Sequence, residues 1–131
     1  MNAKGQTDED DWNEKFEAYK KAFPQEADEF VRRMSGKLPE NFESEMDKFI
    51  AKTQEEMPNI ASRKASQNAI EAMGPIVPEL LGGSADLTGS NLTNWSGTEK
   101  INASNAGGNY LSWGVREFGM AHMVNGITLH G

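Results

Sequence analysis

The chain has 131 residues, carries a formal net charge of −7 and contains no cysteine. The acidic balance, with no cluster of basic side chains, excludes nonspecific nucleic-acid binding, and the lack of thiols excludes disulfides, thiolate metal sites and a cysteine nucleophile. No apolar run approaches the roughly 20 residues that span a bilayer, and the polar, acidic start is unlike a secretory signal, so we expect a cytoplasmic protein without membrane contact.

The composition changes near Pro58. Residues 1–58 hold 15 acidic and 9 basic residues but only two glycines, whereas residues 59–131 hold 11 glycines and a net charge of −1. Charge runs on this scale are typical of solvated helix faces. Glycine supplies backbone conformations that other residues adopt only at a cost. We therefore expect a helical first segment and a second segment that is rich in loops.

Three amphipathic helices are predicted in the first segment. Apolar side chains recur at helical spacing, and Pro24, Gly36 and Pro58 end the successive runs. We interpret the aromatic and methionine stripes as packing surfaces rather than as cofactor contacts. The stripes are Trp12, Phe16, Tyr19 and Phe23, then Ala27, Phe30, Val31 and Met34, and finally Phe42, Met46, Phe49, Ile50 and Met57.

The second segment predicts the beginning of an α/β unit with a parallel sheet. A fourth helix is expected from Ile60 to Met73, and a buried strand over residues 78–81 that opens at Gly82-Gly83 into a polar loop. A short strand over residues 110–113 and a helix over residues 117–129 follow. Ligands collect at the C-terminal ends of the strands in open α/β sheets. Because no closing element is visible, we expect this domain to be incomplete.

Glu117 is the first candidate for a catalytic residue. It follows Val115 and precedes Phe118 and Met120, so we expect partial burial, which raises the pKa of a carboxyl group. A carboxyl group of raised pKa can exchange a proton with a ring nitrogen near neutral pH. The alternative is an exposed glutamate at a helix N-terminus, stabilised by the helix dipole. The residues alone leave these two interpretations open.

Arg63 is a candidate for phosphate binding, because it lies in the first turn of the fourth helix, where anions are favoured. The alternative is a surface arginine paired with a neighbouring carboxylate. Other motifs are weaker: Gly82-Gly83-Ser84 lacks the lysine of a P-loop, and Ser84 has no histidine at a motif spacing, which argues against hydrolase chemistry. The two histidines, His122 and His130, are expected on a helix surface rather than in a metal site.

Three stretches in the second segment together resemble the bacterial type of transketolase. They are I-A-S-R-K-A-S-Q-N-A-I-E (residues 60–71), L-G-G-S-A-D-L-T-G-S-N-L-T (residues 81–93) and G-V-R-E-F-G-M-A (residues 114–121). The resemblance continues upstream through F-P-Q-E-A-D-E-F-V-R-R-M, so it covers nearly the whole chain.

The resemblance implies a division of the chain in two. Residues 1–58 correspond to a helical interdomain segment, and residues 59–131 to the N-terminal part of the domain that binds the pyrimidine of thiamine diphosphate. Transketolases move a two-carbon ketol unit from a ketose phosphate to an aldose phosphate. Their site forms between the two subunits of a homodimer, and the ligands of the diphosphate and of Mg²⁺ are expected outside this chain.

The resemblance also implies roles for single residues. Glu117 matches the glutamate that contacts N1′ of the aminopyrimidine, where a shared proton favours the imino tautomer and so prepares thiazolium C2 for attack on the ketose carbonyl. Arg63 and Ser90 match positions that hold the sugar phosphate. Asp86 matches a loop carboxylate near the cofactor, and Gly82-Gly83 would let the backbone pass close to a ligand.

Two other functions remain open at this point. The chain could be a truncated, non-catalytic protein whose acidic helices and half-domain bind a transketolase subunit. It could also be one subunit of a split enzyme, which we disfavour because a workable split should fall between domains. In every case we expect the chain alone to be inactive.

Overall fold

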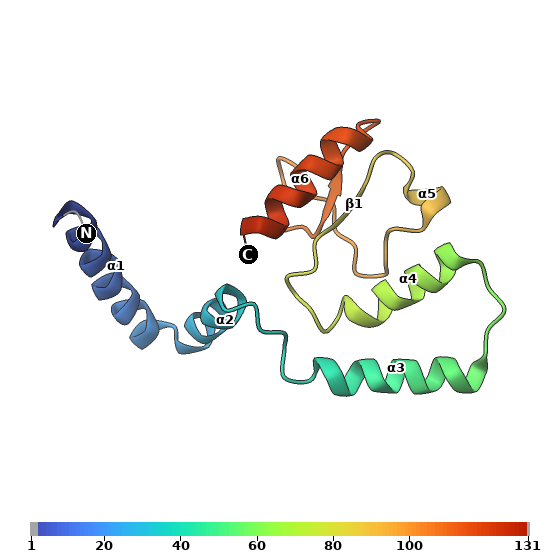
Figure 1. Ribbon diagram of the computed structural model, residues 1–131, viewed down its shortest axis with the longest axis horizontal. Coiled ribbons are helices and arrows are strands. Elements are labelled where there is room, and N and C mark those ends of the chain that lie inside the picture. Colours follow the sequence, from blue (N-terminus) through green and yellow to red (C-terminus); the bar gives the residue numbers. More distant parts are fainter. Residues whose placement is uncertain (1–2, 131) are drawn as a thin grey trace. The chain divides into compact units, whose positions relative to one another are not determined.

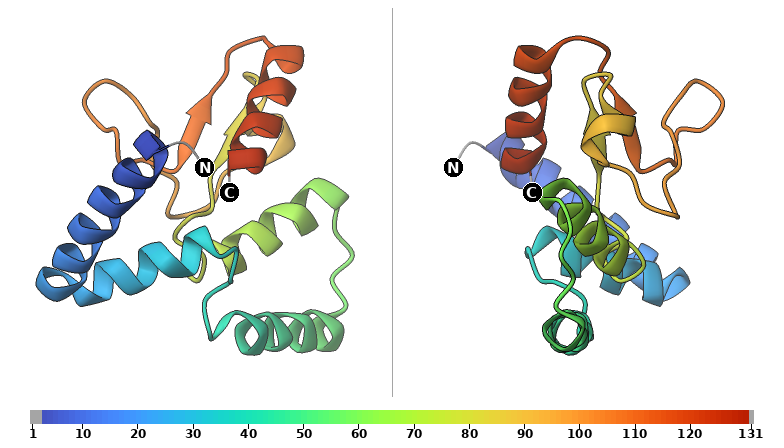
Figure 2. Two further views of the ribbon diagram at one scale, coloured as in Figure 1. Left: turned by 60° about the vertical axis from the view of Figure 1, so that its left-hand side comes forward. Right: turned by 90° about the vertical axis from the view of Figure 1, so that its right-hand side faces the viewer.

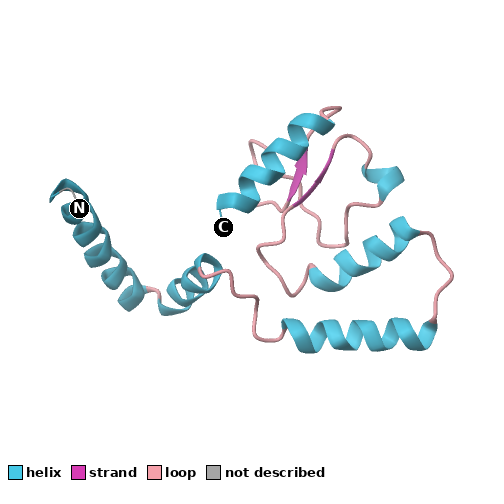
Figure 3. Cartoon of the chain, viewed as in Figure 1, coloured by secondary structure: helices cyan, strands magenta, loops and turns pink. Residues whose placement is uncertain are grey.

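The computed structural model describes residues 3–130. Contacts within the chain divide it into two compact units, residues 1–37 and residues 38–131. Helices dominate both units, and the strands are confined to the second (Figure 3). No helix of the described range is long and apolar enough to cross a membrane.

The first unit is a pair of helices, α1 (Ala3–Ala22) and α2 (Pro24–Met34). Pro24 has no N–H and therefore cannot continue α1, but its fixed φ suits the first turn of α2. The predicted stripes pack the two helices together, with the ring centroids of Phe16 and Phe30 5.5 Å apart. The stripes stay partly in solvent, since Trp12 is 52% exposed and, among the described residues of this unit, only Ala27 is buried.

One carboxylate organises the last turns of α2. Glu29 accepts hydrogen bonds from the guanidinium groups of Arg32 and Arg33, with N···O distances of 2.7 Å. These bonds lower the pKa of the Glu29 carboxyl from 4.5 to about 2. Because the Glu29 side chain is still 37% exposed, the pairs contribute only modestly to stability.

The second unit joins a helical pair to a small parallel sheet. Figure 1 shows α3 and α4 running side by side in opposite directions, and a groove of about 980 Å³ lies between them. The predicted bounds hold within two residues for α4 and α6, and the third predicted helix corresponds to α3, whereas the short helix α5 was not expected. The elements of this unit are α3 (Phe42–Glu56), α4 (Ser62–Met73), β1 (Gly82–Ser84), α5 (Thr88–Asn91), β2 (Tyr110–Ser112) and α6 (Glu117–His130).

The first strand is not where the sequence predicted it. Residues 78–81 form no strand, because Leu80 N–H turns back to the carbonyl of Val77, 3.0 Å away. The glycine pair itself begins the strand, since Gly82 N–H donates to the carbonyl of Asn109 at 2.9 Å. The two strands pair in parallel, as expected, with Gly82 opposite Tyr110 and Ser84 opposite Ser112.

The sheet and α6 enclose the centre of this unit. Figure 2 shows α6 along one face of the sheet, and a cavity of about 160 Å³ lies between β1 and residues of α6 such as Met120 and Ile127. Tyr110 is the largest fully buried side chain. Val77, Ser84 and Ala85 are also buried.

Candidate functional site at the C-terminal edge of the sheet

The parallel pairing brings two candidate carboxylates to the same edge. Ser84 and Ser112 end their strands opposite each other, and the ladder continues as Trp113 N–H donates to the carbonyl of Ser84 at 3.0 Å. Asp86 follows β1 by two residues, and Glu117 follows β2 by five. Both residues therefore leave the sheet at the edge where ligands collect in such folds.

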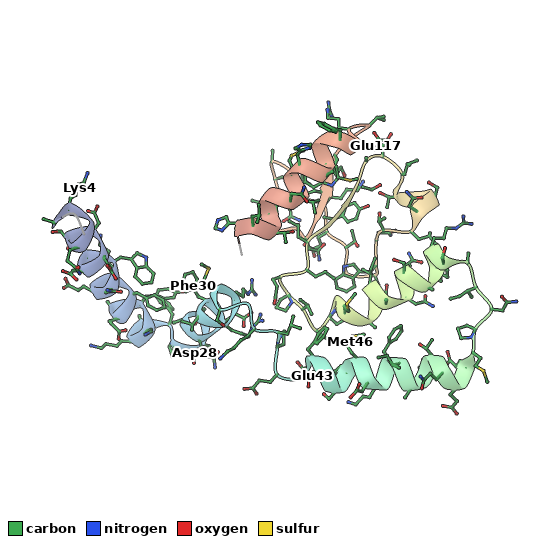
Figure 4. The ribbon with its side chains drawn as sticks, viewed as in Figure 1. Lys4, Asp28, Phe30, Glu43, Met46 and Glu117 are labelled. Atoms are coloured by element: carbon green, nitrogen blue, oxygen red, sulfur yellow. The ribbon has the colours of Figure 1, made fainter. Side chains whose placement is uncertain are left out.

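Glu117 is the first residue of α6, at the end of the helix that faces this edge (Figure 4). Our expectation of partial burial is wrong for the described chain, because Glu117 is exposed and its neighbours Val115 and Phe118 are 75% and 81% exposed. The alternative, an exposed glutamate at a helix N-terminus, describes this geometry. Its carboxylate makes no hydrogen bond or ion pair with the residues that the structure describes, so it can accept a proton donor from outside.

The turn that leads into α6 leaves this carboxylate unpaired. Gly114 adopts a φ of +64°, and a Cβ there would come 2.6 Å from Nη1 of Arg116. The guanidinium of Arg116 folds back and donates to the carbonyl of Trp113 at 3.0 Å. Arg116 is thus used to close the turn and does not neutralise Glu117.

Asp86 lies in a strained loop. Its φ of +66° falls in the left-handed region, and Leu92, six residues later, has a φ of +55°. Such conformations of non-glycine residues cost roughly 1–3 kcal/mol each and persist where the surrounding structure determines them. The buried hydroxyl of Ser84 helps to fix this loop by accepting the N–H of Leu87 at 3.0 Å, which gives Ser84 a structural role.

Ser90 lies between the two strained residues, in α5. Its side chain is exposed, and its hydroxyl donates to the carbonyl of Leu87 over 3.2 Å. This distance is long for an O–H···O bond, whose usual range ends near 3.0 Å. The hydroxyl is therefore held weakly and can change partner when a stronger acceptor, such as a phosphate oxygen, arrives.

Arg63 projects from the face of α4 that contacts the segment after α5. Residues four apart share one helix face, which aligns Arg63 with Gln67 and Glu71. Gln67 donates to the carbonyl of Asn94 at 3.0 Å, and Ser96 N–H donates to the Glu71 carboxylate at 2.8 Å.

This face of α4 carries two charged groups, Glu71 and Arg63, and they differ in their contacts. The hydrogen bonds from Ser96 lower the pKa of the Glu71 carboxyl. Arg63 is exposed and forms no ion pair with the described residues, so the alternative of a surface arginine paired with a neighbouring carboxylate is not observed.

The glycine pair has a packing role that the sequence did not reveal. A Cβ on Gly83 would lie 2.6 Å from the carbonyl oxygen of Leu111 and would overlap the indole of Trp113. At Gly82, a Cβ would only touch the ring of Tyr110, at 3.4 Å. Close packing within the chain therefore accounts for Gly83 without any ligand.

The side chains at this edge fit a heterocycle that can be protonated better than they fit a metal ion. Within residues 3–130, no three His, Asp or Glu side chains come together as a metal site would require. An unpaired carboxylate with exposed Val115 and Phe118 beside it offers one acceptor and an adjoining apolar surface. Such a surface suits a flat ring with a nitrogen that can be protonated, such as an aminopyrimidine.

Comparison with protein families defines the class first. Residues 58–131 match the family model "Transketolase, pyrimidine binding domain", and residues 1–39 match "Transketolase, thiamine diphosphate binding domain". The second segment is therefore of the kind that binds the pyrimidine of thiamine diphosphate. The match spans more than half of the chain, and the chain belongs to the transketolase family.

Individual relatives agree with this assignment. The chain is 62% identical to transketolase 1 of Escherichia coli K12 over 127 residues and 57% identical to transketolase 1 of Vibrio cholerae. Each alignment covers 97% of this chain and 19% of the relative, so the chain spans about a fifth of the length of these proteins.

Solved structures also agree. A Pichia stipitis transketolase in complex with sedoheptulose 7-phosphate superposes with a TM-score of 0.77 at 38% identity, over 95% of this chain and 19% of that one. Transketolase from Leishmania mexicana gives a TM-score of 0.75 at 35% identity, over 94% of this chain and 18% of that one.

The packing role of Gly83 leads to a first prediction. Gly83→Ala should destabilise the chain by about 1–3 kcal/mol, because the new methyl group forces Leu111 or Trp113 to move. Urea unfolding of the variant, without cofactor or substrate, measures the loss. Gly126→Ala is the control: a Cβ there meets nothing within 4 Å, and alanine within α6 should stabilise by about 0.5–1 kcal/mol. Unchanged stability of Gly83→Ala would contradict the packing account.

Proposed function

We propose that this chain forms part of a transketolase, which transfers a two-carbon ketol unit from a ketose phosphate to an aldose phosphate with thiamine diphosphate. The observation that carries the proposal is the exposed Glu117 carboxylate, which has no partner within the described chain and lies at the C-terminal edge of a parallel sheet. The family match over residues 58–131 supports it, and it gives no support to a non-catalytic binding protein.

Glu117 is proposed to act at N1′ of the aminopyrimidine. Its carboxylate shares a proton with this ring nitrogen and holds the tautomer whose exocyclic nitrogen is basic. The bound ring and the surfaces around it are proposed to supply the burial that Glu117 lacks in the described chain. Thiamine diphosphate, when bound, supplies the electron sink that lets the bond between C2 and C3 of the ketose break.

Arg63 and Ser90 are proposed to hold the phosphate of the sugar. A guanidinium offers two parallel N–H donors to phosphate oxygens, and the weakly held Ser90 hydroxyl offers a third donor. The Pichia stipitis structures include complexes with sedoheptulose 7-phosphate, xylulose 5-phosphate and fructose 6-phosphate, all of them ketose phosphates. Asp86 is proposed to lie near the cofactor.

The remaining proposals concern the whole enzyme. Residues 1–58 are proposed as the helical segment between domains and residues 59–131 as the N-terminal part of the pyrimidine-binding domain. We further propose a cytoplasmic homodimer of the pentose phosphate pathway in which Mg²⁺ accompanies the diphosphate, with ligands from outside this chain.

A hybrid enzyme tests the role of Glu117. In the hybrid, this chain replaces the matching segment of Escherichia coli transketolase 1, to which it is 62% identical. Glu117→Gln keeps the shape of the side chain but cannot take up the proton, so kcat should fall by about 100-fold or more, the usual contribution of a positioned acid or base. Steady-state ketol transfer at saturating thiamine diphosphate and Mg²⁺ measures the change.

The matched control is Glu43→Gln, because Glu43 is also an exposed glutamate in the first turn of a helix (Figure 4). Its kcat should stay within about twofold of the parent hybrid, as is usual for surface substitutions. Equal activity of the Glu117 and Glu43 variants would exclude Glu117 from the proton transfer.

Arg63→Gln tests the phosphate site in the same hybrid. Loss of a charge-assisted hydrogen bond should raise KM for a ketose phosphate about 10- to 100-fold, while KM for an unphosphorylated ketol donor should not change. The control is Lys64→Gln, since Lys64 is a neighbouring cation that instead contacts Gln67 at 2.9 Å. An equal rise in KM for the ketose phosphate and for the unphosphorylated ketol donor would show that Arg63 does not bind the phosphate.

A further inference from the structure

The hydroxyl of Tyr110 makes two contacts that the proposed chemistry does not use. It lies 2.7 Å from Oγ1 of Thr88 and 2.7 Å from Oγ1 of Thr93. The residue is only 2% exposed, and its backbone pairs with Gly82 in the sheet. Tyr110, the first residue of β2, therefore joins the sheet to both ends of one loop.

The loop held by these two contacts is the one that carries Ser90. Thr88 and Thr93 bracket four residues, 89–92, and both threonines bond to the same oxygen atom. Leu92 within this loop and Asp86 just before it both have positive φ. A strained conformation of this kind needs an external restraint, and the Tyr110 hydroxyl is one that reaches the loop from the sheet.

We propose that Tyr110 is a positioning residue for the substrate phosphate, acting through Ser90. The inference rests on the proposed function, because it presumes that Ser90 binds the phosphate. The short bonds to Thr88 and Thr93 fix the ends of the loop and so hold the backbone of Ser90 in place. The Ser90 hydroxyl, weakly bonded to Leu87, stays able to change partner. The phenol does not touch the phosphate itself.

Tyr110→Phe in the hybrid enzyme tests the proposal, because it removes only the hydroxyl and keeps the buried ring. KM for a ketose phosphate should rise about tenfold, while kcat and KM for an unphosphorylated ketol donor should not change. Tyr19→Phe is the matched control: Tyr19 is the other tyrosine of the chain and is 40% exposed in α1. It should leave kcat and both KM values unchanged.

Hydrogen exchange gives a readout that does not depend on activity. The amides of Asn91 and Leu92 are bonded to the carbonyls of Leu87 and Thr88, both at 2.9 Å. Tyr110→Phe should speed exchange at these two amides at least tenfold and leave the amides of α4 unchanged. Faster exchange throughout the domain, with all kinetic constants impaired alike, would mean that Tyr110 serves stability alone and would overturn the proposal.

Ser90→Ala separates failure of the inference from failure of the proposed function. If Ser90→Ala raises KM for the ketose phosphate selectively and Tyr110→Phe changes neither KM nor loop exchange, the phosphate site stands and the role of Tyr110 is overturned. If Ser90→Ala has no effect, the role of Ser90 fails, and the inference fails with it.

A second pair of variants covers the case in which Tyr110→Phe does not fold. Thr93→Val removes one of the two bonds and should reproduce the selective rise in KM. Thr93→Ser keeps the hydroxyl and should restore the parent value. A Thr93→Val enzyme with the parent KM would overturn the proposal.

Discussion

The parallel pairing of Gly82–Ser84 with Tyr110–Ser112 determines where the chain leaves the sheet toward Asp86 and Glu117. The register directs both chain segments out of the sheet at one edge, and Asp86 and Glu117 follow within a few residues. The pairing tolerates no side chain at Gly83, where Leu111 and Trp113 occupy the space. The two short strands thus determine that the segments carrying Asp86 and Glu117 begin at the same end of the sheet.

Glu117 at this edge and Arg63 on α4 form no ion pair with the described residues, and specific contacts around them make this possible. Arg116 closes the turn before α6 and so leaves Glu117 unpaired. Gln67 and Glu71 hold the segment after α5, while Arg63, one turn earlier on the same face, forms no ion pair with the described residues. Charges that a folded chain leaves unneutralised in this way are suited to binding charged or protonatable ligands.

Much of the fold could be predicted from the sequence, because proline and glycine mark the helix boundaries. Pro24 and Gly36 delimit α2, and Gly74 follows α4 at the predicted place. The first strand was misplaced because a Gly-Gly pair has little intrinsic preference for strands, and its pairing depends on Asn109, far along the chain. The short helix α5 was missed for a similar reason, since four polar or glycine residues carry no helical periodicity.

The site could be predicted in part. The predicted positions of Glu117 and Arg63 in the first turns of their helices are confirmed, because local sequence encodes where a helix begins, whereas their roles stay proposals. The exposure of Glu117 was not predicted, because apolar neighbours in a sequence do not reveal which surface covers them. The contact of Tyr110 with Thr88 and Thr93 spans about 20 residues of chain and carries no local signal.

A crystal structure of the hybrid enzyme with thiamine diphosphate bound tests the central claim most directly. The distance to be measured joins the Glu117 carboxylate to N1′ of the aminopyrimidine. We predict a single hydrogen bond of about 2.6–3.2 Å between these atoms. A different side chain in contact with N1′, with Glu117 directed into solvent, would contradict the account.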